Sequence, residues 1–142
     1  MKVSEVLREA AEVIETGWCR EATAVDAQGE PTYVDDDSAV RWCPIGAICK
    51  VTLEDVSGHY YYRAIEELGL AIVEDEYVSV PDKVLAQAVA ADDWEYVVAW
   101  WNDSSDDYMT GGDVSSMLRD AAKAAQRTSH IEPPLDANAP PT

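Results

Sequence analysis

The sequence predicts a mostly α-helical, compact single domain of about six helices. Three observations favour this class. Apolar residues recur at helical spacing along most of the chain, helix start and stop signals separate these segments, and the connections between them are short. The chain has 142 residues, 47% of them hydrophobic, so it can bury a core of its own. One helical domain is therefore expected over residues 1–127.

The first helix is predicted at the N-terminus. Ser4 can cap its start, and Gly17 can end it in a left-handed turn. Glutamates occupy its other faces, and its apolar stripe consists of Val3, Val6, Leu7, Ala10, Val13 and Ile14. Residues 22–34 lack this period, but Asp26 to Gly29 supply turn chemistry between β-tolerant pieces. A small β-hairpin is expected near residues 22–34.

A second helix is expected to carry residues 42–51, capped by Ser38 or by an aspartate of the 35–37 run. Pro44 lacks an amide donor and fits best in a first turn, so the helix is predicted to start near Cys43. A third helix is predicted from a Ser57 cap through Leu68, with Gly69 as its stop. Residues 70–80 fit either a strand or an extended loop.

Neighbouring residues on a helix point about 100° apart, so Tyr60, Tyr61 and Tyr62 cannot all face one core. At least one of these rings is expected at the surface.

Three more helices follow. Pro81 and Asp82 open the fourth, and Asp93 can cap the fifth, whose apolar face includes Trp101. Thr110 and Asp113 fit a Thr-x-x-acid capping box at the start of the sixth. Residues 128–142 hold four prolines and little core material, which predicts a disordered tail.

The charge is strongly acidic, with 28 Asp plus Glu against 10 Lys plus Arg and a formal net charge of −18. Without clustered Lys and Arg, direct binding to nucleic acid or to an anionic membrane is disfavoured. The acidity can serve solubility, attract a basic partner or imitate the phosphates of DNA. Because the acids are spread along the whole chain, solubility is the first interpretation.

The chain is predicted to be soluble and cytoplasmic. No apolar run approaches the roughly 20 residues that a membrane helix needs. The N-terminus is amphipathic and acidic, unlike a secretory signal. Three cysteines are an odd number, and Cys43 and Cys49 would point to different sides of a helix, so reduced thiols are expected.

Cys43 is the one candidate nucleophile. A helix N-terminus lowers the pKa of a thiol, and a cysteine with His and Asn elsewhere outlines a papain-like site. His59 or His130 would be the base and Asn102 the orienting group. The alternative is that Cys43 packs as a small apolar residue beside Trp42. We favour packing, because the negative charge of the chain raises a thiol pKa and His130 lies in the predicted tail.

Neither a metal nor a cofactor is predicted. The cysteines and histidines lack zinc-ligand spacing. Asp103, Asp106, Asp107 and Asp113 crowd one loop, but an EF-hand alignment from Asp103 fails at its glycine and glutamate positions. Gly111-Gly112 lack the continuation of a phosphate loop. Asn102 and Asp103 are interpreted as structural, through helix termination and capping.

Three short motifs follow one another along the chain: Gly17-Trp18, Trp42-Cys43-x-x-Gly46-Ala47, and Trp101-Asn102-Asp103 followed by Thr110-x-x-Asp113-Val114. Together they resemble a family of small uncharacterised proteins of actinobacteria and their bacteriophages, over about residues 3–125. The resemblance implies a small accessory protein in such a genome and no particular activity. Pro44 departs from it, since a larger aliphatic residue is expected there.

The leading functional hypothesis is a non-enzymatic acidic interaction protein, phage-encoded, that binds a host or partner protein. Aromatic rings often supply interface energy, and the candidate anchors are Trp18, Tyr60, Tyr62 and Trp100. A hypothesis from another class is a cysteine-dependent hydrolase or transferase with Cys43 as nucleophile, His59 as base and Asn102 as orienting group. A third is a DNA mimic that inhibits a DNA-binding protein.

Overall fold

The computed structural model describes residues 1–104 and 108–128, and within them the chain is mostly α-helical, as predicted. It has six helices and a two-stranded antiparallel sheet in these described residues. The predicted tail at 128–142 lies outside the described residues, apart from Thr128. The elements in chain order are α1 (Val3–Thr16), β1 (Ala24–Val25), β2 (Arg41–Trp42), α2 (Pro44–Val51), α3 (His59–Glu74), α4 (Asp82–Ala91), α5 (Trp94–Ser104) and α6 (Gly111–Thr128).

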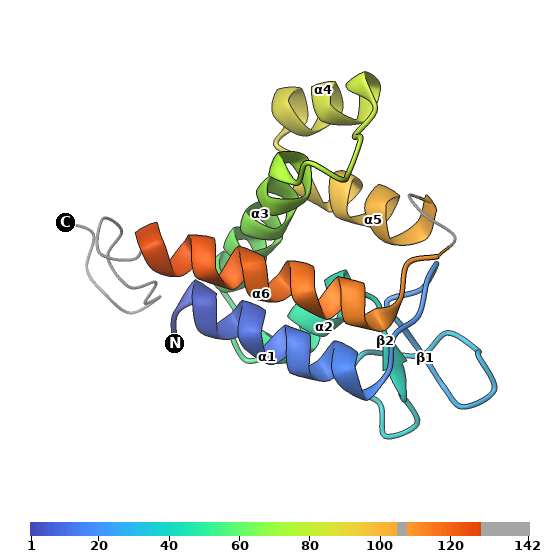
Figure 1. Ribbon diagram of the computed structural model, residues 1–142. Helices are drawn as coiled ribbons and strands as arrows, with labels where there is room; N and C mark the ends of the chain where they lie inside the picture. The colour runs from blue at the N-terminus through green and yellow to red at the C-terminus, as the bar shows by residue number, and fades with distance from the viewer. Residues whose placement is uncertain (105–107, 129–142) are drawn as a thin grey trace.

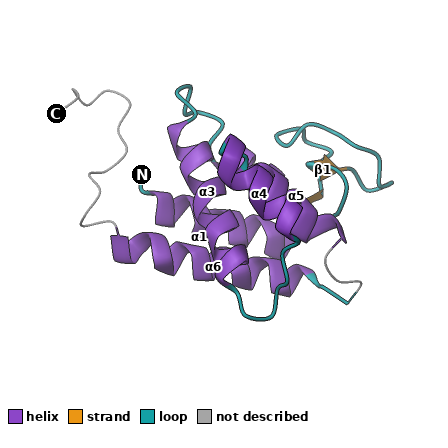
Figure 2. Ribbon diagram, turned by 90° about the horizontal axis from the view of Figure 1, so that it is seen from above, coloured by secondary structure: helices purple, strands orange, loops and turns teal. Residues whose placement is uncertain are grey.

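The long helices α1 and α6 lie side by side and antiparallel, so that the N-terminus is next to the end of α6 (Figures 1 and 2). α3 and α5 pack above this pair, and α4 lies outermost, next to α5. The two short strands lie at the far end of α1, near the start of α6. The largest side chains that are fully buried in the core include Leu7, Ile14, Ile48, Ile65, Leu68, Ile72 and Leu118.

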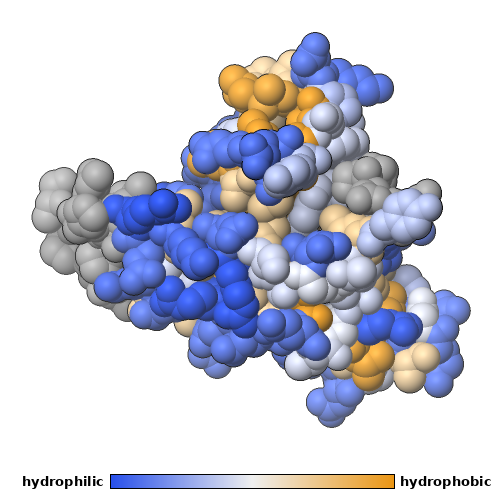
Figure 3. Space-filling view, viewed as in Figure 1, coloured by the Kyte–Doolittle hydropathy of each residue, from blue (hydrophilic) through white to orange (hydrophobic). Residues whose placement is uncertain are grey.

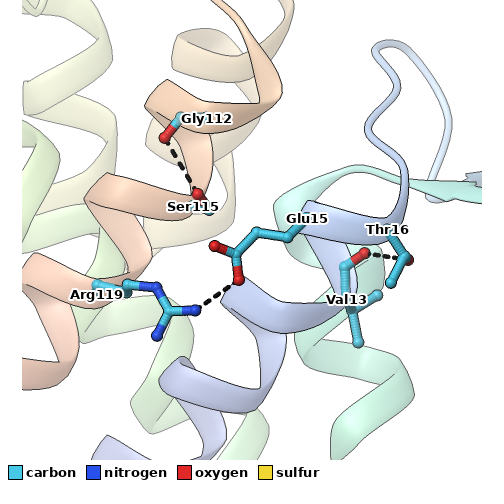
Figure 4. A network of polar contacts seen from close by, with 6 residues as sticks. All are labelled: Val13, Glu15, Thr16, Gly112, Ser115 and Arg119. Atoms are coloured by element: carbon cyan, nitrogen blue, oxygen red, sulfur yellow. Dashed lines mark hydrogen bonds and ion pairs between the residues drawn. The ribbon is translucent and has the colours of Figure 1, made fainter.

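A polar contact at the surface also joins α1 to α6 (Figure 4). The Arg119 guanidinium donates to the Glu15 carboxylate, and both side chains are partly exposed. An exposed ion pair of this kind contributes about 0–1 kcal/mol. The pairing of the two helices therefore depends on the buried apolar stripes between them.

Two helix starts follow the prediction closely. α2 begins with Pro44 in its first turn, and Cys43 is its N-cap residue, so neither Ser38 nor an aspartate of 35–37 caps it. At the start of α6, the Asp113 amide donates to Thr110 Oγ1 at 3.3 Å and the Thr110 amide donates to Asp113 Oδ2 at 2.9 Å. This confirms the capping box, which uses only local sequence.

The start of α1 differs from the prediction, and its end at Gly17 has the predicted position but another backbone conformation. The helix starts before Ser4, which is buried, and the Glu5 carboxylate instead accepts a hydrogen bond from the Lys2 amide. Gly17 is extended, with φ 175°, and not left-handed. Its lack of a side chain has another cause, since a Cβ there would lie 2.2 Å from the carbonyl oxygen of Val40.

Gly69 does not end α3, and the strand or loop expected from residue 70 is wrong as far as Glu74, where the helix ends. Gly69 is buried, and a Cβ on it would lie 2.8 Å from the Trp94 ring of α5. Close packing of α3 against α5 therefore explains this glycine. From the sequence alone, a glycine at this position predicts the end of a helix. At the other end of α3, Gly58 is the N-cap residue, and the Ser57 hydroxyl accepts a hydrogen bond from the His59 amide.

The predicted hairpin region contains a turn, but the sheet partner of β1 lies outside it. Asp26 Oδ1 accepts hydrogen bonds from two amides of the turn, and an isolated bridge pairs Val25 with Pro31. In the sheet itself, Ala24 pairs with Trp42 and Val25 with Arg41. The residues between the strands form a long loop that returns the chain to the start of α2.

Candidate functional site

The three motifs of the sequence meet at one junction, where the segment after α1 crosses the end of α5. The Trp18 indole donates to Asn102 Oδ1 at 2.8 Å, and Asn102 Nδ2 donates to the Cys19 carbonyl at 3.2 Å. Arg20 Nε donates to the Asn102 carbonyl at 2.7 Å. Asn102 is 2% exposed, so a buried amide is satisfied here by contacts from a distant segment.

Asp103 completes the junction. Its Oδ1 accepts hydrogen bonds from the Glu21 amide and from Asn102 Nδ2, both at 3.0 Å. Glu21 has a left-handed backbone, with φ 67°, which is uncommon for a residue with a side chain. The Arg20 guanidinium lies over the Trp18 ring, 5.1 Å from its centroid. These contacts give Asn102 and Asp103 a structural role, although not by the helix termination expected from the sequence.

The Trp42-Cys43 motif binds the same segment through the backbone. The Trp42 amide donates to the Gly17 carbonyl, and the Cys43 amide donates to the Thr23 carbonyl. Gly46 allows the closest approach, because a Cβ on it would lie 1.8 Å from the Thr23 oxygen. The Trp42 indole donates to the Val34 carbonyl at 2.9 Å, which fixes the long loop to the junction.

Cys43 is only 7% exposed, and its sulfur accepts a hydrogen bond from the Gly46 amide at 3.3 Å. Burial raises the pKa of this thiol to about 11, an effect larger than the opposite one of the amides that donate to it. Cys19 and Asp103 raise the pKa further through like charge. A thiol with this pKa carries little thiolate near neutral pH, and thiolate is the reactive form.

The other residues of the alternative catalytic site make their contacts with residues other than Cys43. His59 is an exposed first residue of α3, and the Asn102 amide is committed to Trp18 and Cys19. Among the described contacts, no hydrogen bond joins Cys43 to His59 or to Asn102. His130 lies outside the described residues. The geometry therefore favours a packing role for the thiol.

The four candidate anchor rings differ in exposure. Trp18 is half-buried in the junction, and the Tyr60 hydroxyl donates to the Met1 carbonyl at 2.8 Å. Tyr62 is 65% exposed, which confirms that one ring of the Tyr60–Tyr62 run reaches the surface. Trp100 is half-buried beside the buried Trp101. Tyr62 is thus better placed to meet a partner than Trp18, whose indole is bonded to Asn102.

Trp100 borders a hollow of about 510 Å³, here called the Trp100 groove. It lies between α5, the first half of α6 and the chain that connects α3 to α4. Its floor is formed by aromatic and sulfur-containing side chains: Trp100, Trp101, Met109 and Met117. Its rim carries three carboxylates and an exposed tyrosine: Asp75, Asp113, Asp120 and Tyr77.

Trp100 was predicted from the sequence as a binding residue, and the other residues of the Trp100 groove were not. Tyr77 is 90% exposed. Its single ring within an acidic segment is the feature of the sequence that could have indicated the site. Asp75 and Asp120 are 45 positions apart in the chain, so only the fold brings them together.

Within the described part of the chain, no cluster of three or more His, Cys, Asp or Glu side chains is arranged to hold a metal ion. Asp106 and Asp107 of the acidic loop lie outside that part. Cys19, Cys43 and Cys49 are free thiols. None of the described helices has the length and apolar character needed to cross a bilayer.

Comparison with known proteins gives one match. The model of a family whose description reads "Family of unknown function (DUF6197)" matches residues 1–124. No curated protein and no solved structure matches the chain. The matched range contains the whole junction and the Trp100 groove, and it ends within α6.

Proposed function

The chain belongs to the DUF6197 family, and we propose that it is a non-enzymatic acidic protein that binds a basic surface on a partner protein. The observation that carries this proposal is the exposure of tyrosine rings on a chain of net charge −18. Four rings are more than half exposed: Tyr33 at 81%, Tyr62 at 65%, Tyr77 at 90% and Tyr108 at 90%. Tyrosine is enriched at interface hot spots, where its ring supplies contact area and its hydroxyl a hydrogen bond.

Several of the few cations of the chain have intramolecular partners, and the formal net charge remains −18. Arg63 pairs with Glu66 and Glu67, and Arg119 pairs with Glu15. Lys50 lies over the Trp42 ring, 5.4 Å from its centroid. The excess carboxylates thus attract a basic partner over a distance set by the salt concentration.

Figure 3 shows how side chains are distributed on one face of the molecule. Hydrophilic residues cover much of the α1 and α6 side, and apolar residues gather over α4. Val89 of α4 is 69% exposed. On a mixed apolar and acidic surface, the charge can attract a basic partner and the buried apolar area can stabilise the complex.

The burial of Cys43 and its raised pKa disfavour a cysteine hydrolase, and we do not propose one. Three free thiols are compatible with the reducing cytoplasm that we propose as the setting. The resemblance to actinobacterial and phage proteins makes a phage-encoded protein with a bacterial host partner the most specific form of the proposal. It also supplies the source of material for the test.

The test is capture from an actinobacterial lysate on immobilised protein, at about 50 mM and about 500 mM NaCl. The proposal expects a basic protein that is retained at low salt and lost at high salt. Tyr62→Ala should weaken the capture of that protein if this ring is an anchor, and Tyr33→Ala, at an exposed ring that was not among the predicted anchors, serves as the comparison. Capture of nothing at either salt contradicts the proposal. A captured DNA-binding protein that duplex DNA displaces would instead identify DNA mimicry.

A further inference from the structure

We propose that the Trp100 groove binds a short peptide segment of the partner, in which an arginine is flanked by apolar residues. The inference rests on the proposed function and adds to it a location and a chemical class of ligand. It depends on three properties of the groove: its size, the composition of its floor and the sign of its rim.

The size suits a peptide segment better than a single ion. A volume of about 510 Å³ lies within the range of roughly 300–1,000 Å³ that is typical of ligand pockets. The floor is made of rings and thioethers, since Trp101, Met109 and Met117 are each at most 9% exposed and Trp100 is half-buried. Methionine side chains adapt to irregular apolar partners, so this floor can accept an aliphatic side chain.

The rim selects for positive charge. Asp75, Asp113 and Asp120 line the groove, and no lysine or arginine is among its described lining residues. Two other hollows of similar size differ in this respect. The hollow beside Tyr62 contains Arg63, and the hollow beside Tyr60 contains Lys50. The carboxylates of the Trp100 groove can therefore bind a cation of the partner, since no lysine or arginine among the described lining residues competes for them.

Arginine fits these surroundings better than lysine does. Its planar guanidinium stacks on aromatic faces and donates two parallel hydrogen bonds to a carboxylate. Asp120 is exposed on α6, three positions after Met117, and can pair with such a group at the mouth of the groove. Asp113 Oδ2 and Asp75 Oδ1 already accept amide hydrogen bonds, but both side chains still contribute negative charge to the rim.

The test is a titration of the full chain, labelled with ¹⁵N, followed by the indole N–H signals of its five tryptophans. The probe is the peptide Ac-Leu-Arg-Leu-NH₂, and the control replaces its arginine with citrulline, which has the same shape and no charge. The Trp100 indole should shift and saturate with a Kd of the order of millimolar. The indoles of Trp42 and Trp94 should not shift, because they donate to Val34 and Asp92 outside the groove.

Variants locate the site. Trp100→Ala should raise the Kd for the peptide about tenfold, as expected for an aromatic anchor. Asp120→Asn preserves the shape of the side chain and should raise the Kd about two- to fivefold, as expected for the loss of one exposed charge pair. Asp37→Asn is the matched control, because Asp37 is exposed in the loop before β2 and outside the groove.

Three results would overturn the inference. They are an absence of Trp100 shifts up to about 10 mM peptide, equal binding of the citrulline peptide, and equal effects of Asp120→Asn and Asp37→Asn. Failure here is distinguishable from failure of the proposed function. A salt-sensitive partner that Trp100→Ala still captures fully would exclude the groove and leave partner binding intact.

Discussion

The Trp18 indole nitrogen lies 2.8 Å from Asn102 Oδ1, and this hydrogen bond joins two motifs that are 84 positions apart in the chain. Asn102 is almost fully buried, and its side-chain nitrogen is bonded to the Cys19 carbonyl. The short motifs that characterise the sequence are thus explained mainly by folding. In the proposed function, the exposed rings and carboxylates around these motifs contact the partner.

Asn102→Ala should lower the free energy of unfolding by about 2–3 kcal/mol, because it removes a buried amide and leaves the half-buried Trp18 indole N–H and the Cys19 carbonyl without their partner. Urea denaturation at neutral pH measures the loss. A double-mutant cycle with Trp18→Phe isolates the pair and should give a coupling energy of about 0.5–3 kcal/mol. Additive effects of the two substitutions would show that this hydrogen bond does not hold the junction.

Gly46→Ala should prevent folding or cost more than about 3 kcal/mol, because the new Cβ would lie 1.8 Å from the Thr23 carbonyl oxygen, a backbone atom. Gly112→Ala is the matched control. Its new Cβ meets only Thr110 Oγ1 at an ordinary 3.5 Å, so the stability should change by no more than about 1 kcal/mol. Thermal unfolding followed by circular dichroism compares the two. Similar melting temperatures would refute the close approach of the Thr23 segment to α2.

Two helix starts and one glycine show what could be predicted from the sequence and what could not. The capping box of Thr110 and Asp113 was predictable because both partners lie within one helical turn. The start of α2 was predictable because Pro44 restricts its own position. Gly69 was misread, since the ring that packs against it comes from Trp94, 25 positions further along.

The candidate site was less accessible for the same reason. Trp100 could be selected as a half-exposed ring, but its acidic rim combines Asp75, between α3 and α4, with Asp113 and Asp120 of α6. Likewise, the Trp-Asn-Asp motif was visible, while its partners Trp18 and Glu21 could not be paired with it from spacing. Local chemistry was predictable, and long-range pairing was not.

Asp55 stabilises the start of α3 in a pH-dependent way. Its carboxylate accepts hydrogen bonds from the Ser57 hydroxyl and from the Ser57 and Tyr60 amides, which hold its pKa below the ordinary value. A lowered folded-state pKa gives stability that is present above the unfolded-state pKa, near 3.9, and is lost as pH falls through the folded value. Asp55→Ala should therefore destabilise the protein by about 1 kcal/mol at neutral pH and by less in acid. A difference from wild type that is the same at pH near 7 and near 3 would contradict this role.

The excess of 28 acidic over 10 basic residues should make the fold more stable as salt is added. Screening reduces repulsion among exposed carboxylates, so the melting temperature should rise between about 20 mM and about 500 mM NaCl. Neutralising three exposed acids together, with Glu9→Gln, Glu12→Gln and Asp37→Asn, should reduce this dependence. KCl in place of NaCl controls for ion-specific binding. A melting temperature that is independent of salt would show that the charges are too far apart to matter.

We propose that the protein acts by binding a partner and that the Cys43 side chain serves in packing. With a pKa of about 11, Cys43 should have a thiolate fraction roughly 300-fold smaller, near pH 7.5, than that of a free cysteine with pKa near 8.5. The most direct test is alkylation of the native protein with iodoacetamide below pH 8, with each cysteine followed by mass spectrometry. The account predicts that the half-buried Cys19 and Cys49 react first and that Cys43 is protected until denaturant is added. Faster alkylation of Cys43 than of the other two thiols in the folded protein would contradict it, and would make thiol chemistry the leading function.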